Sequence, residues 1–129
     1  MKAILCKEYG PAEKLVIEDV PSPEVKGRGV KVRVKAAGLN FPDTLIIENK
    51  YQLKPSLPFS PGGEMAGEVI EVGDKITRFK VGDRVAGLTG YGAFAEEVIV
   101  PEQNLLPVPD GMSDEKAAAC TMVYGTSYY

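Results

Sequence analysis

Residues 58–85 read PFSPGGEMAGEVIEVGDKITRFKVGDRV, and this stretch decides the fold. Residues 61–63 interrupt the chain, because proline lacks an N–H and fixes φ whereas glycine tolerates positive φ. Residues 65–72 then predict a strand that ends at the Gly-Asp turn of residues 73–74. A second Gly-Asp turn at residues 82–83 precedes the next expected strand. Turns this close together favour a small, strongly curved barrel over a flat sheet.

Strand patterns also occur on both sides of this stretch. Residues 1–6 and 15–20 predict the two strands of a hairpin, with a turn at residues 10–11. In residues 30–34 valines alternate with basic residues, which indicates a half-buried antiparallel strand with a basic face toward water. Residues 93–100 predict a further strand, so the domain is expected to be mainly β.

Two segments favour helices. A helix is expected over residues 40–50, with Asn40 as its N-cap and Asp43 near its positive end. Ser113 is expected to cap a second helix, which continues through a run of alanines. The residues that follow are apolar up to Tyr129 and lack a polar tail, so we expect the chain to break off in mid-element.

Length and composition limit the class of protein. A chain of 129 residues suits one compact domain that buries roughly two-thirds of its unfolded surface. The net charge is −3 without a basic run, which argues against nucleic-acid binding, and no apolar run has the length of a membrane span. The two cysteines, Cys6 and Cys120, are expected to be reduced and buried in a cytoplasmic protein. The absence of histidine excludes a histidine-based triad or zinc site within this chain.

Three ordered motifs carry a family resemblance that runs along the whole chain. PGGEMAG at residues 61–67 and GDRV at residues 82–85 resemble the medium-chain dehydrogenase/reductase superfamily. AGLNFPD at residues 37–43 resembles its zinc-free quinone oxidoreductase branch. The resemblance implies a mainly β, partly open GroES-like barrel with a few short helices, residues 1–129 forming the substrate-side domain. The Rossmann domain expected to follow is missing, because its GxGxxG fingerprint is absent from these residues.

The same resemblance implies that zinc is absent. In zinc-dependent members of the superfamily, ligands stand at the positions of Asn40, Gly63 and, by a looser alignment, Met122. Amide, glycine and thioether replacements leave too few thiolate, imidazole or carboxylate donors for zinc. The four-cysteine structural zinc lobe is also missing, since residues 84–91 run through without an insertion.

The resemblance also suggests site residues, most of which could instead have a purely structural role. Asn40 is similar to the amide that faces the nicotinamide and the substrate, but it also suits a helix cap. Tyr51 stands where enoyl reductases place their acid and quinone reductases line the substrate cleft, but it also suits an aromatic that closes the barrel. Phe41 is expected to line the substrate site, and Thr126 to reach the nicotinamide or to be a plain helix residue. Quinone reductases often carry tyrosine where Leu45 stands, so this position departs from their pattern.

Two acidic residues near these positions are expected to be structural. Glu64 is interpreted as a buried carboxylate that neighbouring backbone N–H groups satisfy, because burying it without partners would be costly. Asp43 is interpreted as an acid at a helix start rather than as a proton donor.

The implied parent function is NADPH-dependent reduction of a quinone or another conjugated carbonyl by hydride transfer. An enoyl-thioester or alkenal reductase with Tyr51 as acid is an alternative, and a non-catalytic GroES-like binding module is another. The resemblance further implies a homodimer that acts on a small molecule, and the composition described above is typical of a cytoplasmic protein that binds neither nucleic acid nor a membrane.

Overall fold

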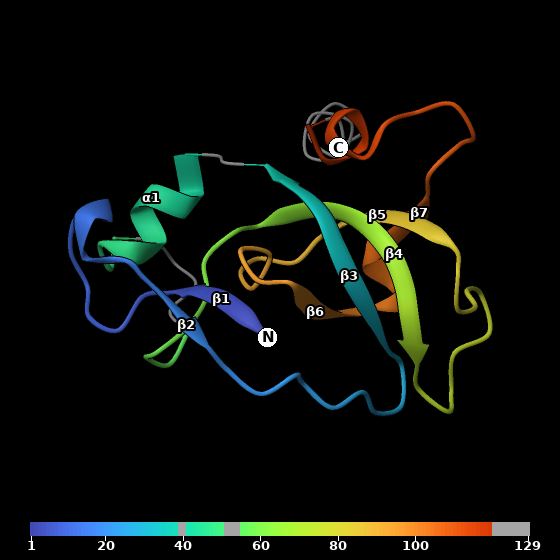
Figure 1. The fold of residues 1–129 in the computed structure, drawn as a ribbon, viewed down its shortest axis with the longest axis horizontal. Helices are drawn as coiled ribbons and strands as arrows, with labels where there is room; N and C mark the ends of the chain where they lie inside the picture. Colours follow the sequence, from blue (N-terminus) through green and yellow to red (C-terminus); the bar gives the residue numbers. More distant parts are fainter. Residues whose placement is uncertain (39–40, 51–54, 120–129) are drawn as a thin grey trace.

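A computed structural model of the protein describes residues 1–38, 41–50 and 55–119. Its strands form two antiparallel sheets, one of order β1-β2 and one of order β6-β3-β4-β5-β7 (Figure 1). The strands are β1 (Lys2–Leu5), β2 (Val16–Asp19), β3 (Gly29–Gly38), β4 (Glu64–Val72), β5 (Arg84–Leu88), β6 (Glu97–Pro101) and β7 (Leu105–Pro107). The helical elements are α1 (Phe41–Ile47), two 3₁₀ turns, η1 (Ala12–Lys14) and η2 (Glu102–Asn104), and a helix at residues 114–119. The predicted mainly β class is confirmed, although the described strands form open sheets that do not close into a barrel.

Strands β3 and β4 form the central ladder of the large sheet. The pairing runs from Val30 opposite Val72 to Gly38 opposite Glu64, with irregularities after Lys31 and after Val34. The valine alternation correctly predicted β3, because Val30 and Val32 are fully buried on one face of the strand. Strand β3 continues beyond the predicted residues 30–34. Strand β6 pairs with the first half of β3, on the side opposite β4.

The main core lies on one face of this sheet. Val30, Val32, Met65, Val69, Val85, Ala93, Val98, Val100 and Leu105 form it. Each fully buried valine or leucine of this kind contributes about 1.5–3 kcal/mol relative to an exposed side chain.

A second, small-residue cluster covers the opposite face of the sheet. Ala66 of β4 and Ala86 of β5 pack against Ala117 and Ala118 of the helix at residues 114–119. Figure 1 shows this helix above the sheet near β5 and β7. Its predicted N-cap is confirmed, since the Lys116 N–H donates to Ser113 Oγ at 3.2 Å.

The small β1-β2 ribbon is the predicted hairpin, and two isolated bridges connect residues 3 and 6 to loop residues that precede β6 and β4. Isolated bridges pair Ala3 with Ala95 and Cys6 with Phe59, and the Cys6 N–H donates to the Phe59 carbonyl at 2.7 Å. Cys6 and Phe59 also pack with Ile46 and Ile47 of α1, which places the helix against the ribbon (Figure 1).

The prediction of a continuous strand over residues 93–100 is wrong at its start. Only Glu97–Pro101 forms β6. Ala93 and Phe94 instead donate their N–H groups to the carbonyls of Gly62 and Pro61, at 3.1 and 3.0 Å. Their donors are therefore used by the loop before β4 rather than by a strand ladder. No helix in the described parts of the chain is long and apolar enough to cross a membrane.

Candidate active site

Three strand ends meet at one edge of the large sheet. Gly38 at the end of β3 pairs with Glu64 at the start of β4, and Glu64 pairs with Leu88 at the end of β5. Helix α1 begins with Phe41, only three residues beyond Gly38. The antiparallel register thus brings the two most informative sequence motifs, residues 37–43 and 61–67, to the same edge.

The Pro-Gly-Gly turn of residues 61–63 is fixed by the loop that follows β5. The Thr89 N–H donates to the Gly63 carbonyl at 2.8 Å, and Thr89 Oγ1 donates to the Gly62 carbonyl at 2.9 Å. Gly62 has φ of 104°, and a Cβ added there would lie 2.6 Å from Phe94 Cδ1. Glycine is therefore required at this position by both conformation and space.

Gly63 faces the start of α1. A Cβ added at Gly63 would lie 3.5 Å from the Gly90 carbonyl oxygen and 3.6 Å from Asp43 Oδ1, which are ordinary contact distances. The backbone here thus has room for a Cβ, but glycine supplies no ligand atom. Within the described residues, no group of three or more His, Cys, Asp or Glu side chains is arranged to hold a metal ion.

Two carboxyl groups are buried at this edge. Glu64 is 3% exposed and Asp43 is 4% exposed. The predicted burial of Glu64 and the predicted place of Asp43 in the first turn of α1 are confirmed, whereas the burial of Asp43 was not predicted. Neither residue is without an interaction partner, as expected for buried polar residues.

Most of the predicted site side chains cannot be placed. Asn40, Tyr51 and Thr126 lie outside the described residues, and so does the Met122 position of the zinc comparison. Phe41 is the first residue of α1, which the sequence predicted to be helical. The described structure therefore shows the frame around this site, and the roles of the side chains stay predictions.

Sequence reasoning missed one aromatic residue near this edge. Tyr91 lies between two glycines with positive φ, Gly90 and Gly92. Its ring makes an edge-to-face contact with Phe59, with centroids 6.1 Å apart, and the residue is 40% exposed. A tyrosine placed between glycines was the available signal, since such a turn presents the side chain rather than burying it in a strand.

Cys6 is a buried thiol beneath α1. The residue is 1% exposed, and its Sγ donates to the Glu8 carbonyl oxygen at 3.3 Å. Burial, and to a smaller extent the charge of Glu8, raises the pKa of this thiol above its ordinary value of 9.0. The predicted burial is confirmed for Cys6, whereas its reduced state stays a prediction and Cys120 lies outside the described residues.

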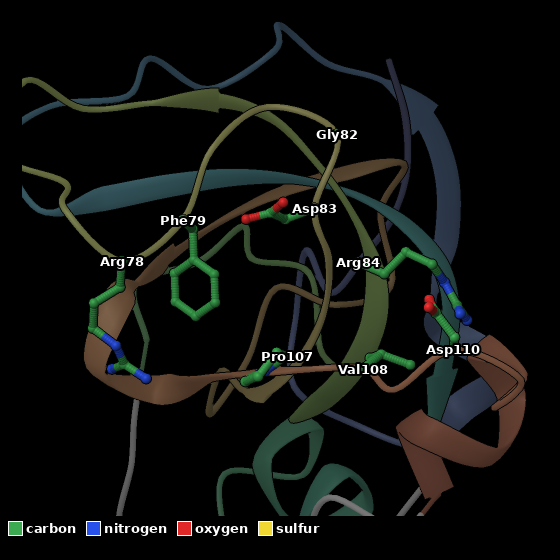
Figure 2. A pocket seen from close by; sticks show the side chains of 8 residues that line it. All are labelled: Arg78, Phe79, Gly82, Asp83, Arg84, Pro107, Val108 and Asp110. Carbon is green, nitrogen blue, oxygen red and sulfur yellow. The ribbon is translucent and has the colours of Figure 1, made fainter.

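A cavity of about 510 Å³ lies at the other end of β5 (Figure 2). Its lining includes Arg78, Phe79, Asp83 and Arg84. Arg84 is the first residue of β5 and its guanidinium pairs with Asp114 at 3.0 Å, whereas the candidate site lies beyond the last residue of the strand. Figure 2 shows the Arg84 side chain directed away from Phe79. This cavity is therefore separate from the candidate site.

The fold and the motifs at the sheet edge define a GroES-like domain. The family model of the alcohol dehydrogenase GroES-like domain matches residues 26–110, and the chain belongs to this family. It is 46% identical over 129 residues to the quinone oxidoreductase-like protein 2 homolog of Nematostella vectensis, a match that covers 98% of the chain and 35% of that protein. The chain thus spans about a third of the length of the curated relatives it matches.

Solved structures agree with this assignment. The Escherichia coli quinone oxidoreductase complexed with NADPH superposes with a TM-score of 0.93 at 32% identity, over 100% of this chain and 40% of that one. The human synaptic vesicle membrane protein VAT-1 homolog-like protein superposes with a TM-score of 0.94 at 36% identity, over 99% of this chain and 41% of that one.

Proposed function

We propose that the whole protein containing this chain reduces quinones or other conjugated carbonyls by hydride transfer from NADPH, and that this domain forms the substrate side of the site without zinc. The observation that carries the proposal is the match to quinone oxidoreductases, one of them solved with NADPH. The glycine at position 63 supports the zinc-free part, because it supplies no ligand where zinc-dependent members have one.

The chain's own residues would position and polarise the substrate. When bound, NADPH supplies the hydride. The Asn40 amide would face the nicotinamide and the substrate, and the Thr126 hydroxyl would reach the nicotinamide. Phe41 would line the substrate site, and the Tyr51 phenol would donate a hydrogen bond or a proton to the oxygen that gains negative charge.

NADPH affinity must come mainly from the rest of the whole protein. All strand pairs among the described residues are antiparallel, so this portion of the chain holds no parallel βαβ unit of the kind that binds dinucleotides. We extend the proposal to a cytoplasmic homodimer, which rests on the family resemblance alone.

The substrate class is tested with Tyr51→Phe in the full-length enzyme, by following NADPH oxidation with benzoquinone and with an enoyl thioester. An enone or enoyl thioester needs a proton on carbon after hydride transfer, so loss of the phenol should lower kcat roughly a hundredfold or more if Tyr51 is the acid. Solvent can protonate the oxygens of a reduced quinone, so we expect a small effect there, mostly in KM. Good turnover of the thioester together with a large loss in the variant would favour the enoyl reductase alternative.

A non-catalytic binding module is the second candidate function. It is favoured by the close structural match to a protein named for a synaptic vesicle membrane protein rather than for a reaction. In this case the wild-type protein would oxidise NADPH with neither benzoquinone nor the enoyl thioester. Calorimetry would then decide whether the full-length protein still binds NADPH.

A further inference from the structure

An exposed aromatic ring stands beside the sheet edge that carries the candidate site. Strand β5 ends at Leu88, the neighbour of Glu64 in the ladder, and Tyr91 follows three residues later. Tyr91 is 40% exposed, whereas Phe59, whose ring it meets edge-to-face, is only 5% exposed. The part of this aromatic pair that a ligand can reach therefore belongs mainly to Tyr91.

The loop that carries Tyr91 is tied by backbone hydrogen bonds on both sides of this residue. Before it, the Thr89 N–H donates to the Gly63 carbonyl at 2.8 Å. After it, the Gly92 N–H donates to the Ser60 carbonyl at 2.7 Å. Both acceptors flank or belong to the Pro-Gly-Gly turn, so the loop is fixed to one of the two motifs that meet at the sheet edge.

Two glycines set the direction of the chain around this side chain. Gly90 has φ of 79° and Gly92 has φ of 106°, a backbone conformation that residues with a Cβ adopt only at a cost. A Cβ added at Gly92 would also lie 3.2 Å from Val98 Cγ2. Tyr91 is thus held between two turning points, and its contact with Phe59 orients the ring.

We propose that the Tyr91 ring is a specificity-determining surface of the substrate site, where it stacks on the ring of a quinone and favours cyclic conjugated carbonyls over linear ones. The inference rests on the proposed function. Aromatic rings attract one another in offset-stacked or edge-to-face arrangements, and a linear alkenal offers no ring for this contact. A side chain that is already fixed also loses little conformational freedom when a ligand binds.

Shielding Phe59 does not by itself account for a tyrosine here. Phe59 packs with Cys6, Ile46 and Ile47 in the cluster beneath α1, so other residues already enclose much of its ring. A tyrosine with only a shielding role would affect stability when it is truncated, whereas a substrate-contacting ring would also affect KM. These two roles therefore predict different results.

The inference is tested in the full-length protein by following NADPH oxidation with naphthoquinone and with crotonaldehyde, a linear alkenal. Tyr91→Ala should raise the KM for naphthoquinone about fivefold with little change in kcat, because a stacking contact is lost from the bound substrate. The KM for crotonaldehyde should change less than about twofold. Tyr91→Phe keeps the ring, so its KM for naphthoquinone should stay within about twofold of the wild-type value.

Phe79→Ala is a matched control that removes an aromatic ring at the other end of β5. Phe79 is partly buried against the main core and lines the separate cavity there (Figure 2). This variant should lower Tm and leave the KM for naphthoquinone unchanged. The Tm of every variant is measured, so that a change in KM is compared only among folded proteins.

Direct binding of naphthoquinone, measured by saturation-transfer NMR without NADPH, makes the result independent of turnover. Its Kd should weaken about fivefold in Tyr91→Ala and stay unchanged in Phe79→Ala. Equal Kd and KM in the wild type and Tyr91→Ala would overturn the inference, and so would an equal rise in the KM for crotonaldehyde or a wild type that does not bind naphthoquinone. If the wild type binds naphthoquinone but reduces neither compound, the proposed function fails, and the Kd values alone decide the role of Tyr91.

Discussion

At the scale of single residues, this domain contains glycines that are needed for two different reasons, a positive φ and a lack of space for a side chain. Gly62 combines positive φ with close neighbours, whereas Gly82 has positive φ of 98° and no atom within 4 Å of an added Cβ. The sequence identified both as turn residues, because glycine next to proline or aspartate is a strong turn signal. It could not distinguish them, since the crowding at Gly62 comes from Phe94, far along the chain.

The first prediction compares alanine at these two positions. Gly82→Ala should cost about 1 kcal/mol of unfolding free energy, the cost of a left-handed backbone for a residue with a side chain. Gly62→Ala should cost clearly more, because its Cβ also meets the Phe94 ring and, at 2.9 Å, the Phe94 backbone nitrogen. Urea unfolding of both variants and the wild type measures the difference. Equal losses of unfolding free energy in the two variants would show that the loop around Phe94 can move aside without a cost in stability.

The second prediction concerns Cys6 and alkaline pH. Its folded-state pKa is raised, so the unfolded thiol ionises first as the pH increases. The contribution of Cys6 to stability is therefore complete below its unfolded pKa and is lost as the pH rises through the folded pKa. Between about pH 8 and about pH 10, the wild type should lose more unfolding free energy than Cys6→Ala does.

This comparison is best made in a Cys120→Ser background, so that Cys6 is the only thiol. Denaturant unfolding at the two pH values gives the free energies. The folded protein should also react slowly with a thiol reagent. Equal pH dependence in the two proteins would mean that burial does not hold the thiol protonated.

At the scale of elements, β4 shows where sequence patterns stop being informative. The second half of this strand contains partly exposed residues, whereas residues 64–67 are all buried, so both faces of the strand are covered there. The helix at residues 114–119 covers the second face through alanines, and nothing near β4 in the sequence indicates that cover. Local periodicity predicts a strand, whereas the element that buries the second face of the strand is determined by tertiary packing.

The third prediction tests the cap of that covering helix. Ser113→Ala removes the acceptor of the Lys116 N–H and should cost about 1 kcal/mol of unfolding free energy. Ser113→Asp restores an acceptor at the same position and should keep most of the stability. Chemical denaturation of the three proteins is the measurement, and an aspartate variant as unstable as the alanine variant would exclude the capping role.

At the scale of the whole molecule, the ladder brings the motifs at residues 37–43 and 61–67 to one sheet edge. Sequence resemblance predicted the family, but the packing of Glu64 on Gly38, where an added Cβ would lie 2.7 Å from Glu64 Cδ, could not be predicted. Such a contact depends on the strand register, and a slip of one residue would move every side chain to the other face. Tyr91 was missed for a similar reason, because its place near the edge follows from the hydrogen bonds of the Thr89 loop.

The fourth prediction concerns metal content. The full-length protein, purified without added metal, should contain far less than one zinc per chain, because Gly63 supplies no ligand atom. A strong chelator should leave NADPH oxidation unchanged. Elemental analysis that finds stoichiometric zinc, together with loss of activity on chelation, would refute the zinc-free site.

The position of β3 in the sheet determines when this fold can form during synthesis. The β1-β2 hairpin is local and can form as soon as residues 1–20 are available. β3 must wait, because one of its edges pairs with β4 and the other with β6, in a ladder that joins Gly29 to Pro101. Pairings between such distant segments slow folding and leave apolar strands exposed to other chains in the meantime. A ribosome therefore has to release nearly the whole domain before its valine-rich strand is protected from aggregation.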